Sequence, residues 1–158
     1  MNFEQRVAEL RLQLPRAAVV PGGIRIPFDW ARVIENRCVL SGHGALDADG
    51  APAGPFGRVP DEVTLKQAQQ SARAAMLAML GTLRSTLGSL DRIRDWVSVS
   101  GFVNAEPGYP QTTAVLNPVS DLLLEVFGDH GRHARSAIGV AALPLNLPVV
   151  VSAEVLIG

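Results

Sequence analysis

The feature that most constrains this fold is an alanine-rich helical pattern that begins after Thr64. Thr64 and Gln67 form a capping-box pattern, in which each side chain accepts a backbone N–H of the first helical turn. Gly88 is a typical residue at the end of a helix. Between them, small and apolar residues recur at spacings of three and four, at Ala68, Ala72, Ala75, Met79 and Leu83. A buried face with so many alanines lets another layer approach closely, and a β-sheet is the layer we expect.

Patterns on both sides of this helix supply the expected sheet. The first segment, Phe3–Leu14, is typical of a short amphipathic helix that Pro15 ends. A second long helix is expected to end at Phe127, before Gly128. Pro118 lies inside it, so either the helix restarts there with Asn117 as its cap, or it kinks. Strands are predicted over Trp30–Ile34, Arg37–Ser41, Ile93–Val103, Ser136–Leu143 and Val149–Ile157.

This order of elements predicts an α/β fold with one mixed β-sheet and two long helices on one face. A length of 158 residues suits one domain with a single core, and we expect residues 1–158 to form it, with residues 1–20 as an N-terminal helical extension. The other face of the sheet would expose apolar side chains of the last strand, either Val149 and Val151 or Val150 and Val155. Self-association is the simplest cover for that face.

Composition excludes several classes of function. The formal net charge is −1 and no basic stripe with interleaved aromatic residues occurs, which disfavours a nucleic-acid partner. No apolar run reaches 18 residues and the first residues do not resemble a signal peptide, so we expect a cytoplasmic protein with no membrane partner. The single cysteine, Cys38, cannot form an internal disulfide and is expected to be buried.

The segment from Gly131 to Pro144 is the strongest candidate for a site. Arg132, His133 and Arg135 precede a run of small apolar residues that ends at Pro144. A guanidinium group stays charged at ordinary pH and its planar fork of donors fits a carboxylate bidentately. Small residues beside it would let a ligand lie against the backbone. The segment therefore predicts a carboxylate-binding pocket anchored by Arg135, or else an ordinary surface arginine before a strand.

Other candidate sites are weaker. His130 and His133 have a His-x-x-His spacing, but a metal ion would need further ligands from elsewhere, so a solvated loop or an interface is the preferred interpretation. His43 is not surrounded by the residues of a Ser-His-Asp arrangement. No glycine-rich phosphate-binding loop occurs. We therefore expect neither a metal nor a nucleotide site.

Several segments together resemble the RidA family, also called the YjgF/YER057c/UK114 family. They are Pro27-Phe28, Val39–His43, Gly101–Asn104, Val115–Leu123 and Arg135–Pro144. The Asn-x-x-Ser-Asp-Leu-Leu string from Asn117, the Gly-Arg-His-Ala-Arg-Ser string from Gly131 and the N-terminal helix resemble a longer subgroup of that family.

The resemblance implies a homotrimer with ligand clefts between neighbouring subunits. It implies that Arg135 grips the carboxylate of a small 2-imino or 2-enamino acid, a carboxylate-bearing metabolite that is hydrolysed to a 2-keto acid and ammonia. No metal or organic cofactor is implied. The other positions that the resemblance places at the ligand are Phe28, Ser41, Gly42, Asn117 and Ala137.

Three positions depart from the family pattern. Phe28 stands where the family commonly has tyrosine, Ala137 where many members have cysteine, and Val150 where active members have a glutamate that positions water. Glu154 lies four residues further along the predicted strand, about 13 Å away at ~3.3 Å per residue, so it cannot simply take over the role of that glutamate. An interface or surface charge is therefore its preferred role. Two functions therefore stay open: a metal-free imine or enamine deaminase, and a non-catalytic protein that binds small carboxylates. Val150 favours the second, or else a different hydrolytic chemistry in this subgroup of the family.

Overall fold

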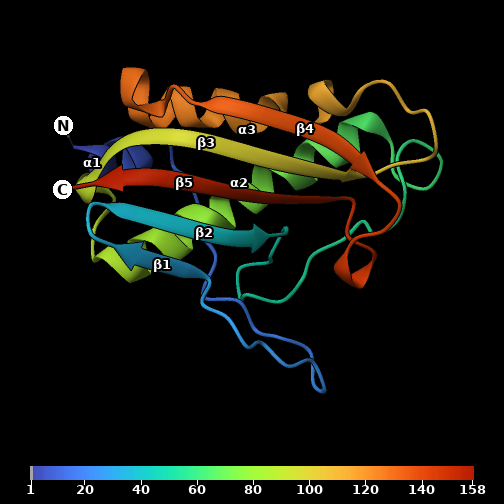
Figure 1. The fold of residues 1–158 in the computed structure, drawn as a ribbon, viewed down its shortest axis with the longest axis horizontal. Helices are drawn as coiled ribbons and strands as arrows, with labels where there is room; N and C mark the ends of the chain where they lie inside the picture. Colours follow the sequence, from blue (N-terminus) through green and yellow to red (C-terminus); the bar gives the residue numbers. More distant parts are fainter. Residues whose placement is uncertain (1) are drawn as a thin grey trace.

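The computed structural model describes residues 2–158 and contains one five-stranded mixed sheet (Figure 1). The strands are β1 (Ala31–Ile34), β2 (Arg37–His43), β3 (Ile93–Asn104), β4 (Ala134–Val140) and β5 (Val149–Ile157). They lie side by side in the order β1-β2-β5-β3-β4. β3 and β4 are parallel and the other neighbours are antiparallel. The predicted mixed sheet is confirmed, and β5 has the predicted bounds.

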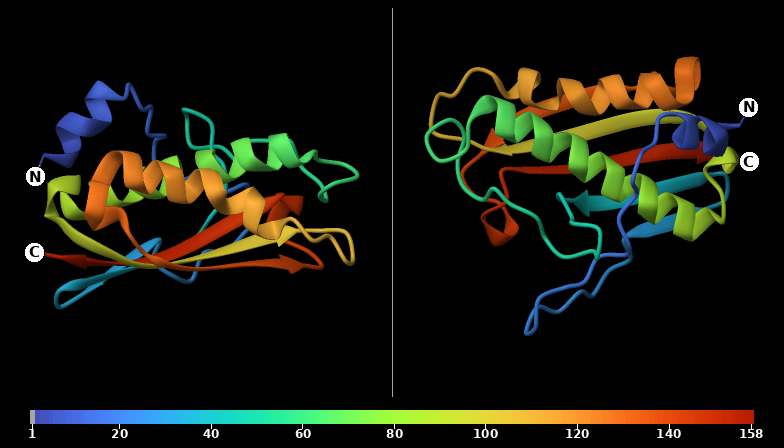
Figure 2. Two further views of the ribbon diagram at one scale, coloured as in Figure 1. Left: turned by 90° about the horizontal axis from the view of Figure 1, so that it is seen from above. Right: turned by 180° about the vertical axis from the view of Figure 1, so that it is seen from behind.

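Both long helices, α2 (Leu65–Leu87) and α3 (Thr112–Phe127), lie on one face of this sheet, as predicted (left panel of Figure 2). The core fills the space between the helices and the sheet. Along β5, Val149, Val151 and Val155 are buried towards the helices, whereas Val150 lies on the opposite face. Val155 therefore belongs with Val149 and Val151, and the pairing of Val150 with Val155 was wrong because strand residues five apart point to opposite faces.

The sequence signals of α2 are confirmed in detail. Thr64 and Gln67 form both hydrogen bonds of the capping box, and Gly88 ends the helix with a φ of 82°. Ala68, Ala72 and Ala75 are completely buried. Small side chains at these positions let α2 lie close to the sheet, which is the arrangement that the alanine pattern predicted.

α3 is a single helix that runs through Pro118. Of the two alternatives at Pro118, the restart capped by Asn117 is wrong, because the helix begins at Thr112 and Asn117 lies inside it. Proline has no N–H, so it cannot donate to the carbonyl of Ala114 four residues earlier. The side chain of Gln69 on α2 donates to that carbonyl instead, at 2.9 Å from Nε2 to O. A neighbouring helix thus satisfies the group that Pro118 leaves free.

The N-terminal helix α1 (Phe3–Glu9) is shorter than predicted. Leu12 donates its N–H to the Val7 carbonyl, Arg11 donates to the Ala8 carbonyl, and Arg11 has a φ of 54°. These bonds form a Schellman motif, which ends a helix through one left-handed residue that is usually glycine. No sequence signal marks this helix end, because the left-handed residue is an arginine.

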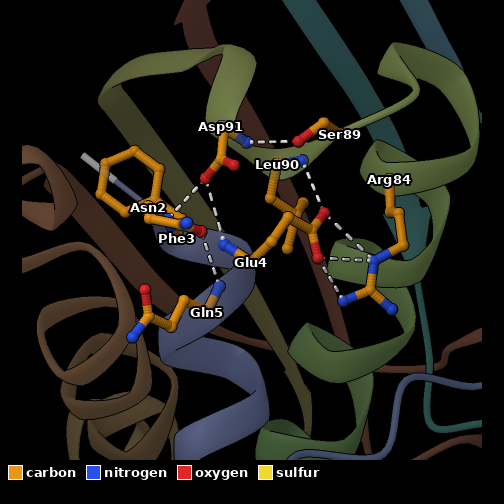
Figure 3. Close-up of polar contacts among 8 residues, drawn as sticks. All are labelled: Asn2, Phe3, Glu4, Gln5, Arg84, Ser89, Leu90 and Asp91. Carbon is orange, nitrogen blue, oxygen red and sulfur yellow. Dashed lines mark hydrogen bonds and ion pairs between the residues drawn. The ribbon is translucent and has the colours of Figure 1, made fainter.

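A polar cluster holds α1 against the end of α2 (Figure 3). The Glu4 carboxylate accepts from the Arg84 guanidinium at 2.7 Å and from the backbone N–H of Leu90 at 2.8 Å. Asp91 accepts from the backbone N–H groups of Phe3 and Glu4. The ring of Phe3 is buried against Phe127, with ring centroids 4.8 Å apart. The first helix is therefore attached both by polar bonds and by core packing.

The chain from α1 to β1 crosses α2 before it reaches the sheet. Its backbone passes so close to α2 that a Cβ atom on Gly81 would lie 2.9 Å from the Pro15 carbonyl oxygen. Val19 then donates its N–H to the Gly50 carbonyl at 2.8 Å. Residues 18–28, which we call the N-terminal strap, follow this contact and project below β1 and β2 in Figure 1.

The face of the sheet opposite the helices is open, since no helix among residues 2–158 covers it (Figure 2). Ile34, Val39 and Ile138 on this face have 42–49% of their surface exposed. Val150 and Phe102 are half-buried beside them. The expectation of an apolar open face is therefore met. None of the helices described between residues 2 and 158 is both long and apolar enough to cross a membrane.

Candidate functional site

Arg135 lies inside β4 rather than before a strand, because β4 begins two residues earlier than predicted. It pairs with Val99 of β3, which is buried on the helix side, so the Arg135 side chain points towards α3. Nη1 donates to Ser120 Oγ at 2.9 Å. Nη2 donates to Asn117 Oδ1 at 3.1 Å and to the Thr113 carbonyl at 3.3 Å. The structure thus brings two of the predicted site residues, Arg135 and Asn117, into contact.

His133 extends this network. Its Nδ1 lies 2.7 Å from the Gly131 carbonyl oxygen, and its Nε2 lies 2.9 Å from Ser120 Oγ. A carbonyl oxygen can only accept, so Nδ1 carries a hydrogen; in the tautomer with its hydrogen on Nδ1, Nε2 accepts the Ser120 hydroxyl. Ser120 therefore donates to His133 and accepts from Arg135.

Gly131 fixes the far end of the network. It is buried against α3, and a Cβ atom there would lie 2.2 Å from the carbonyl oxygen of Leu123. Real side chains do not tolerate that distance, so only glycine fits this close approach of loop and helix. The Gly131 carbonyl consequently has a well-defined position from which to orient the His133 ring.

These residues border a cavity of about 660 Å³ between α3 and β4, which we call the polar cavity. Its lining residues are Asn117, Ser120, Leu124, Gly128, Asp129, Arg132, His133 and Arg135. Two arginines and one aspartate give it a positive balance of charge. A guanidinium group can bind a carboxylate bidentately along either of two edges, Nε–Nη2 or Nη1–Nη2. Both edges include Nη2. A bidentate acid would therefore displace the Asn117 amide or the Thr113 carbonyl from Arg135.

Ala137 lies two residues further along β4, on the same side of the strand as Arg135, but outside the polar cavity. Its side chain packs against the core, and its carbonyl accepts from the Thr112 hydroxyl at 3.1 Å. Ala137 thus joins β4 to the start of α3.

A second cavity, of about 500 Å³, lies between the N-terminal strap and the ends of β2 and β5; we call it the apolar cavity. Its lining includes Val19, Ile24, Ile26, Phe28, Trp30, Gly42, His43, Leu145, Leu147 and Val150. Phe28 packs edge-on against Trp30, with ring centroids 5.2 Å apart. The structure therefore brings the predicted residues Phe28 and Gly42 to one cavity and places Val150 beside them.

Gly42 lies at an irregularity in the pairing of β2 with β5. A Cβ atom at Gly42 would lie 2.9 Å from Val150 Cγ1. The absence of a side chain at position 42 thus makes room for the branched side chain at position 150.

Ser41 does not line the apolar cavity. Its hydroxyl donates to the Asp29 carbonyl at 2.6 Å, and its N–H donates to the Trp30 carbonyl at 3.0 Å. Ser41 therefore joins β2 to the residues that follow the N-terminal strap.

His43 is buried at the edge of the apolar cavity, with both ring nitrogens engaged. Nδ1 lies 2.6 Å from the Ser41 carbonyl oxygen and Nε2 lies 2.9 Å from Thr82 Oγ1. Burial lowers the pKa of His43, and the hydrogen bond to Ser41 partly opposes that shift. These contacts are those of a neutral core histidine.

Two further predicted positions have structural contacts. Glu154 forms an ion pair with Arg37 on the open face, which is the surface-charge role preferred from the sequence. Cys38 is completely buried, as predicted, and burial raises the pKa of its thiol. Among residues 2–158, no three histidine, cysteine, aspartate or glutamate side chains gather as a metal site.

The two cavities lie at different parts of the sheet. The polar cavity is at the edge strand β4, whereas the apolar cavity is at the end of β2, with β3 and β5 between the two strands. One chain therefore does not bring all six predicted site residues together.

Sequence reasoning missed Ser120 and the link from His133 to Arg135. The signals were present: Ser120 follows Asn117 by three residues on one helix, and His133 precedes Arg135 by two in extended chain, so each pair shares a face.

Comparison with known proteins agrees with this fold. Residues 53–155 match the family model described as "YjgF/chorismate_mutase-like, putative endoribonuclease". A curated relative, Protein TCP17 of Trypanosoma cruzi, is 40% identical over 110 residues, which cover 69% of this chain and 67% of that protein.

Solved structures extend the likeness to almost the whole chain. A protein of unknown function from Agrobacterium tumefaciens is 31% identical with a TM-score of 0.85, covering 98% of this chain and 91% of the other. A protein from Shewanella oneidensis described as a "putative endoribonuclease" is 25% identical with a TM-score of 0.87, covering 99% and 100% of the two chains. Yeast Mmf1 shares the fold at 20% identity, with a TM-score of 0.60 and coverage of 93% and 95%. With more than half of its length matched to the family model, this chain belongs to the YjgF family, also called the RidA family.

Proposed function

We propose that this protein binds small 2-imino or 2-enamino acids through Arg135 and hydrolyses them to 2-keto acids and ammonia. The observation that carries the proposal is the position of the Arg135 guanidinium at the border of a positively charged cavity. The guanidinium is held there by three hydrogen bonds that it donates to α3. Such a group binds a carboxylate more tightly than a flexible surface arginine does, because less side-chain entropy is lost on binding.

The proposal includes assembly into a homotrimer. In it, the polar cavity of one subunit faces the apolar cavity of the next, so that Arg135 and Asn117 lie opposite Phe28 and Gly42. Two observations support this arrangement: the two groups of residues are separated within one chain, and apolar side chains such as Ile138 are exposed on the open face. Burial of that face by a second copy would remove apolar surface from water.

In the proposed reaction, Arg135 holds the carboxylate and water adds to the carbon of the C=N bond. The nitrogen gains a proton and the carbon gains a hydroxyl group, which gives a carbinolamine. That intermediate loses ammonia as its C–O bond becomes a carbonyl, and the 2-keto acid remains. The protein contributes by orienting the acid and by placing backbone groups that polarise the imine.

A second candidate function is non-catalytic binding of small carboxylates. The side chain at position 150 is valine, and no carboxylate lines the apolar cavity to position a water molecule. Glu154, the nearest acidic residue of β5, is paired with Arg37. We do not extend the ribonuclease description of the family model to this chain, because its net charge is −1.

The test compares wild type with Arg135→Ala in the hydrolysis of 2-iminopropionate and 2-iminobutyrate generated in the assay. Arg73→Ala, which removes an arginine that lines neither cavity, is the control, and light scattering gives the number of subunits. We expect Arg135→Ala to lose the acceleration that wild type and Arg73→Ala both give. An assembled wild type without acceleration would reject the deaminase, and binding of 2-oxobutyrate would then support the second function.

A further inference from the structure

We propose that Ser120 and His133 are positioning residues that keep the Arg135 guanidinium in place while a ligand carboxylate displaces its other partners. This inference rests on the proposed function, since it takes Arg135 as the carboxylate anchor. It adds two residues that act through Arg135 rather than on the ligand.

The hydrogen bonds form a series in which every donor points the same way, from Arg135 towards Gly131. The ring of His133 donates from Nδ1 to the Gly131 carbonyl, the Ser120 hydroxyl donates to His133 Nε2, and Arg135 Nη1 donates to Ser120 Oγ. Each of these three donated hydrogens has one acceptor, and each acceptor fixes the orientation of the residue that donates to it. The series of bonds ends at Gly131, where the loop lies so close to α3 that a Cβ atom would lie 2.2 Å from the Leu123 carbonyl oxygen.

This series of hydrogen bonds becomes important when a ligand enters the polar cavity. A bidentate carboxylate must take Nη2 from Asn117 or from the Thr113 carbonyl. Once either partner has left, the bond from Nη1 to Ser120 still orients the guanidinium, together with whichever partner of Nη2 remains. The Ser120 hydroxyl can hold that position because its own hydrogen is committed to His133.

The other charged groups at the cavity do not replace this contact. Arg132 and Asp129 line the cavity but make no hydrogen bond to Arg135, Ser120 or His133 among the described residues. The loss of Ser120 would therefore leave Arg135 held mainly by the groups that the ligand itself displaces.

Paired substitutions separate positioning from a merely structural role. Ser120→Ala removes the hydroxyl, whereas Ser120→Thr keeps it. His133→Asn keeps a donor for the Gly131 carbonyl but cannot reach Ser120, whereas His133→Gln keeps an acceptor for Ser120. Ser85→Ala, an exposed serine on α2, is the control.

For hydrolysis of 2-iminobutyrate, we expect Ser120→Ala and His133→Asn to raise KM about tenfold with little change in kcat, since a hydrogen bond to a charged group is lost. Ser120→Thr, His133→Gln and Ser85→Ala are expected to stay within about threefold of wild type. Equal KM values for Ser120→Ala and wild type would overturn the inference, as would equal losses in both members of each pair.

A second readout does not depend on catalysis. Nitrogen-15 NMR of the Arg135 guanidinium reports its order, and titration with 2-oxobutyrate reports carboxylate binding. We expect Ser120→Ala to broaden or average the Arg135 signals and to weaken 2-oxobutyrate binding about tenfold. If wild type binds 2-oxobutyrate but hydrolyses no imine, the deaminase fails while this inference stands. If wild type does hydrolyse the imine and Ser120→Ala leaves both the spectrum and the affinity unchanged, only this inference fails.

Discussion

The two cavities are similar in volume but opposite in construction. The polar cavity is built mainly on regular elements, with Arg135 on β4 and Ser120 on α3. The apolar cavity is walled by irregular chain, namely the N-terminal strap and the turn around Leu145. A helix and a strand fix a charged group to within a fraction of an ångström, whereas loops can follow the shape of a ligand.

This contrast suggests a division of ligand recognition, in which each cavity recognises a different part of the acid. A carboxylate needs donors at fixed positions, because a misplaced charge–dipole contact loses most of its value. An apolar group needs only a surface of the right size, because the hydrophobic effect is not directional. The polar cavity is therefore expected to determine whether an acid binds, and the apolar cavity to determine which side chain the acid carries.

The largest expected effect tests this division directly. Arg135→Ala should weaken binding of 2-oxobutyrate at least about a hundredfold, because a bidentate charge-assisted contact is lost. Phe28→Ala should weaken it only about threefold to tenfold. Calorimetry with 2-oxobutyrate and its neutral amide measures both. The division would fail if Arg135→Ala weakened the two compounds equally.

A steric test comes next, within the apolar cavity. Gly42→Ala should lower the free energy of unfolding by about 1–3 kcal/mol, because the new methyl group would lie 2.9 Å from Val150 Cγ1. In a Val150→Ala background the same substitution should cost less than about 0.5 kcal/mol. Denaturant unfolding of the four proteins gives the coupling energy. Additive losses would mean that the contact with Val150 is not the cause.

The pH dependence of stability should reveal the buried histidine of the apolar cavity. Because burial lowers the pKa of His43 below its ordinary value of 6.5, the unfolded chain binds a proton first as the pH falls. Stability should therefore decrease below about pH 6.5, by at most about 1.4 kcal/mol per pH unit from this residue. His43→Gln should remove that part of the slope.

The control for this measurement is His130→Gln, which removes an exposed histidine that pairs with Asp95. Unfolding is followed in denaturant at several pH values for wild type and both variants. A slope that His43→Gln leaves unchanged would contradict the assignment of a neutral buried ring.

The smallest expected effect concerns the attachment of α1. Glu4→Gln should lower the free energy of unfolding by about 1 kcal/mol, since the ion pair with Arg84 is partly exposed while the bond from Leu90 N–H can be kept by the amide oxygen. Glu9→Gln, which affects an exposed pair with Arg6, should change it by less than about 0.5 kcal/mol. Thermal unfolding compares the two, and equal effects would argue against a special role of Glu4.

The sequence predicted the architecture better than it predicted the site. The capping box at Thr64 and the stop at Gly88 are local signals, so the helix that carries them was found correctly. The end of α1 was missed because Arg11 adopts a conformation that normally requires glycine. An asparagine before a proline can be either a helix cap or the partner of a distant side chain, and the sequence does not distinguish the two. In the structure, Asn117 accepts a hydrogen bond from Arg135.

The site residues depend on topology, which a linear pattern does not encode. Arg135 could be selected from its neighbours in sequence, but its partners on α3 lie 15 or more positions away in the chain. The separation of Phe28 and Gly42 from Arg135 follows from the strand order, in which β5 is inserted between β2 and β3.

The polar cluster around Glu4 has a consequence beyond stability. The N-terminal strap is attached on both sides: Val19 at its start donates to the Gly50 carbonyl, α1 further back is anchored through Glu4 and Asp91, and the chain after the strap joins the sheet at β1. Attachment on both sides limits how far this loop can move, so a ligand that enters the apolar cavity has less chain to order than it would beside a loop with a free end. Ligand selectivity at Phe28 would then depend in part on the ion pair between Glu4 and Arg84, which lies outside the lining of the apolar cavity.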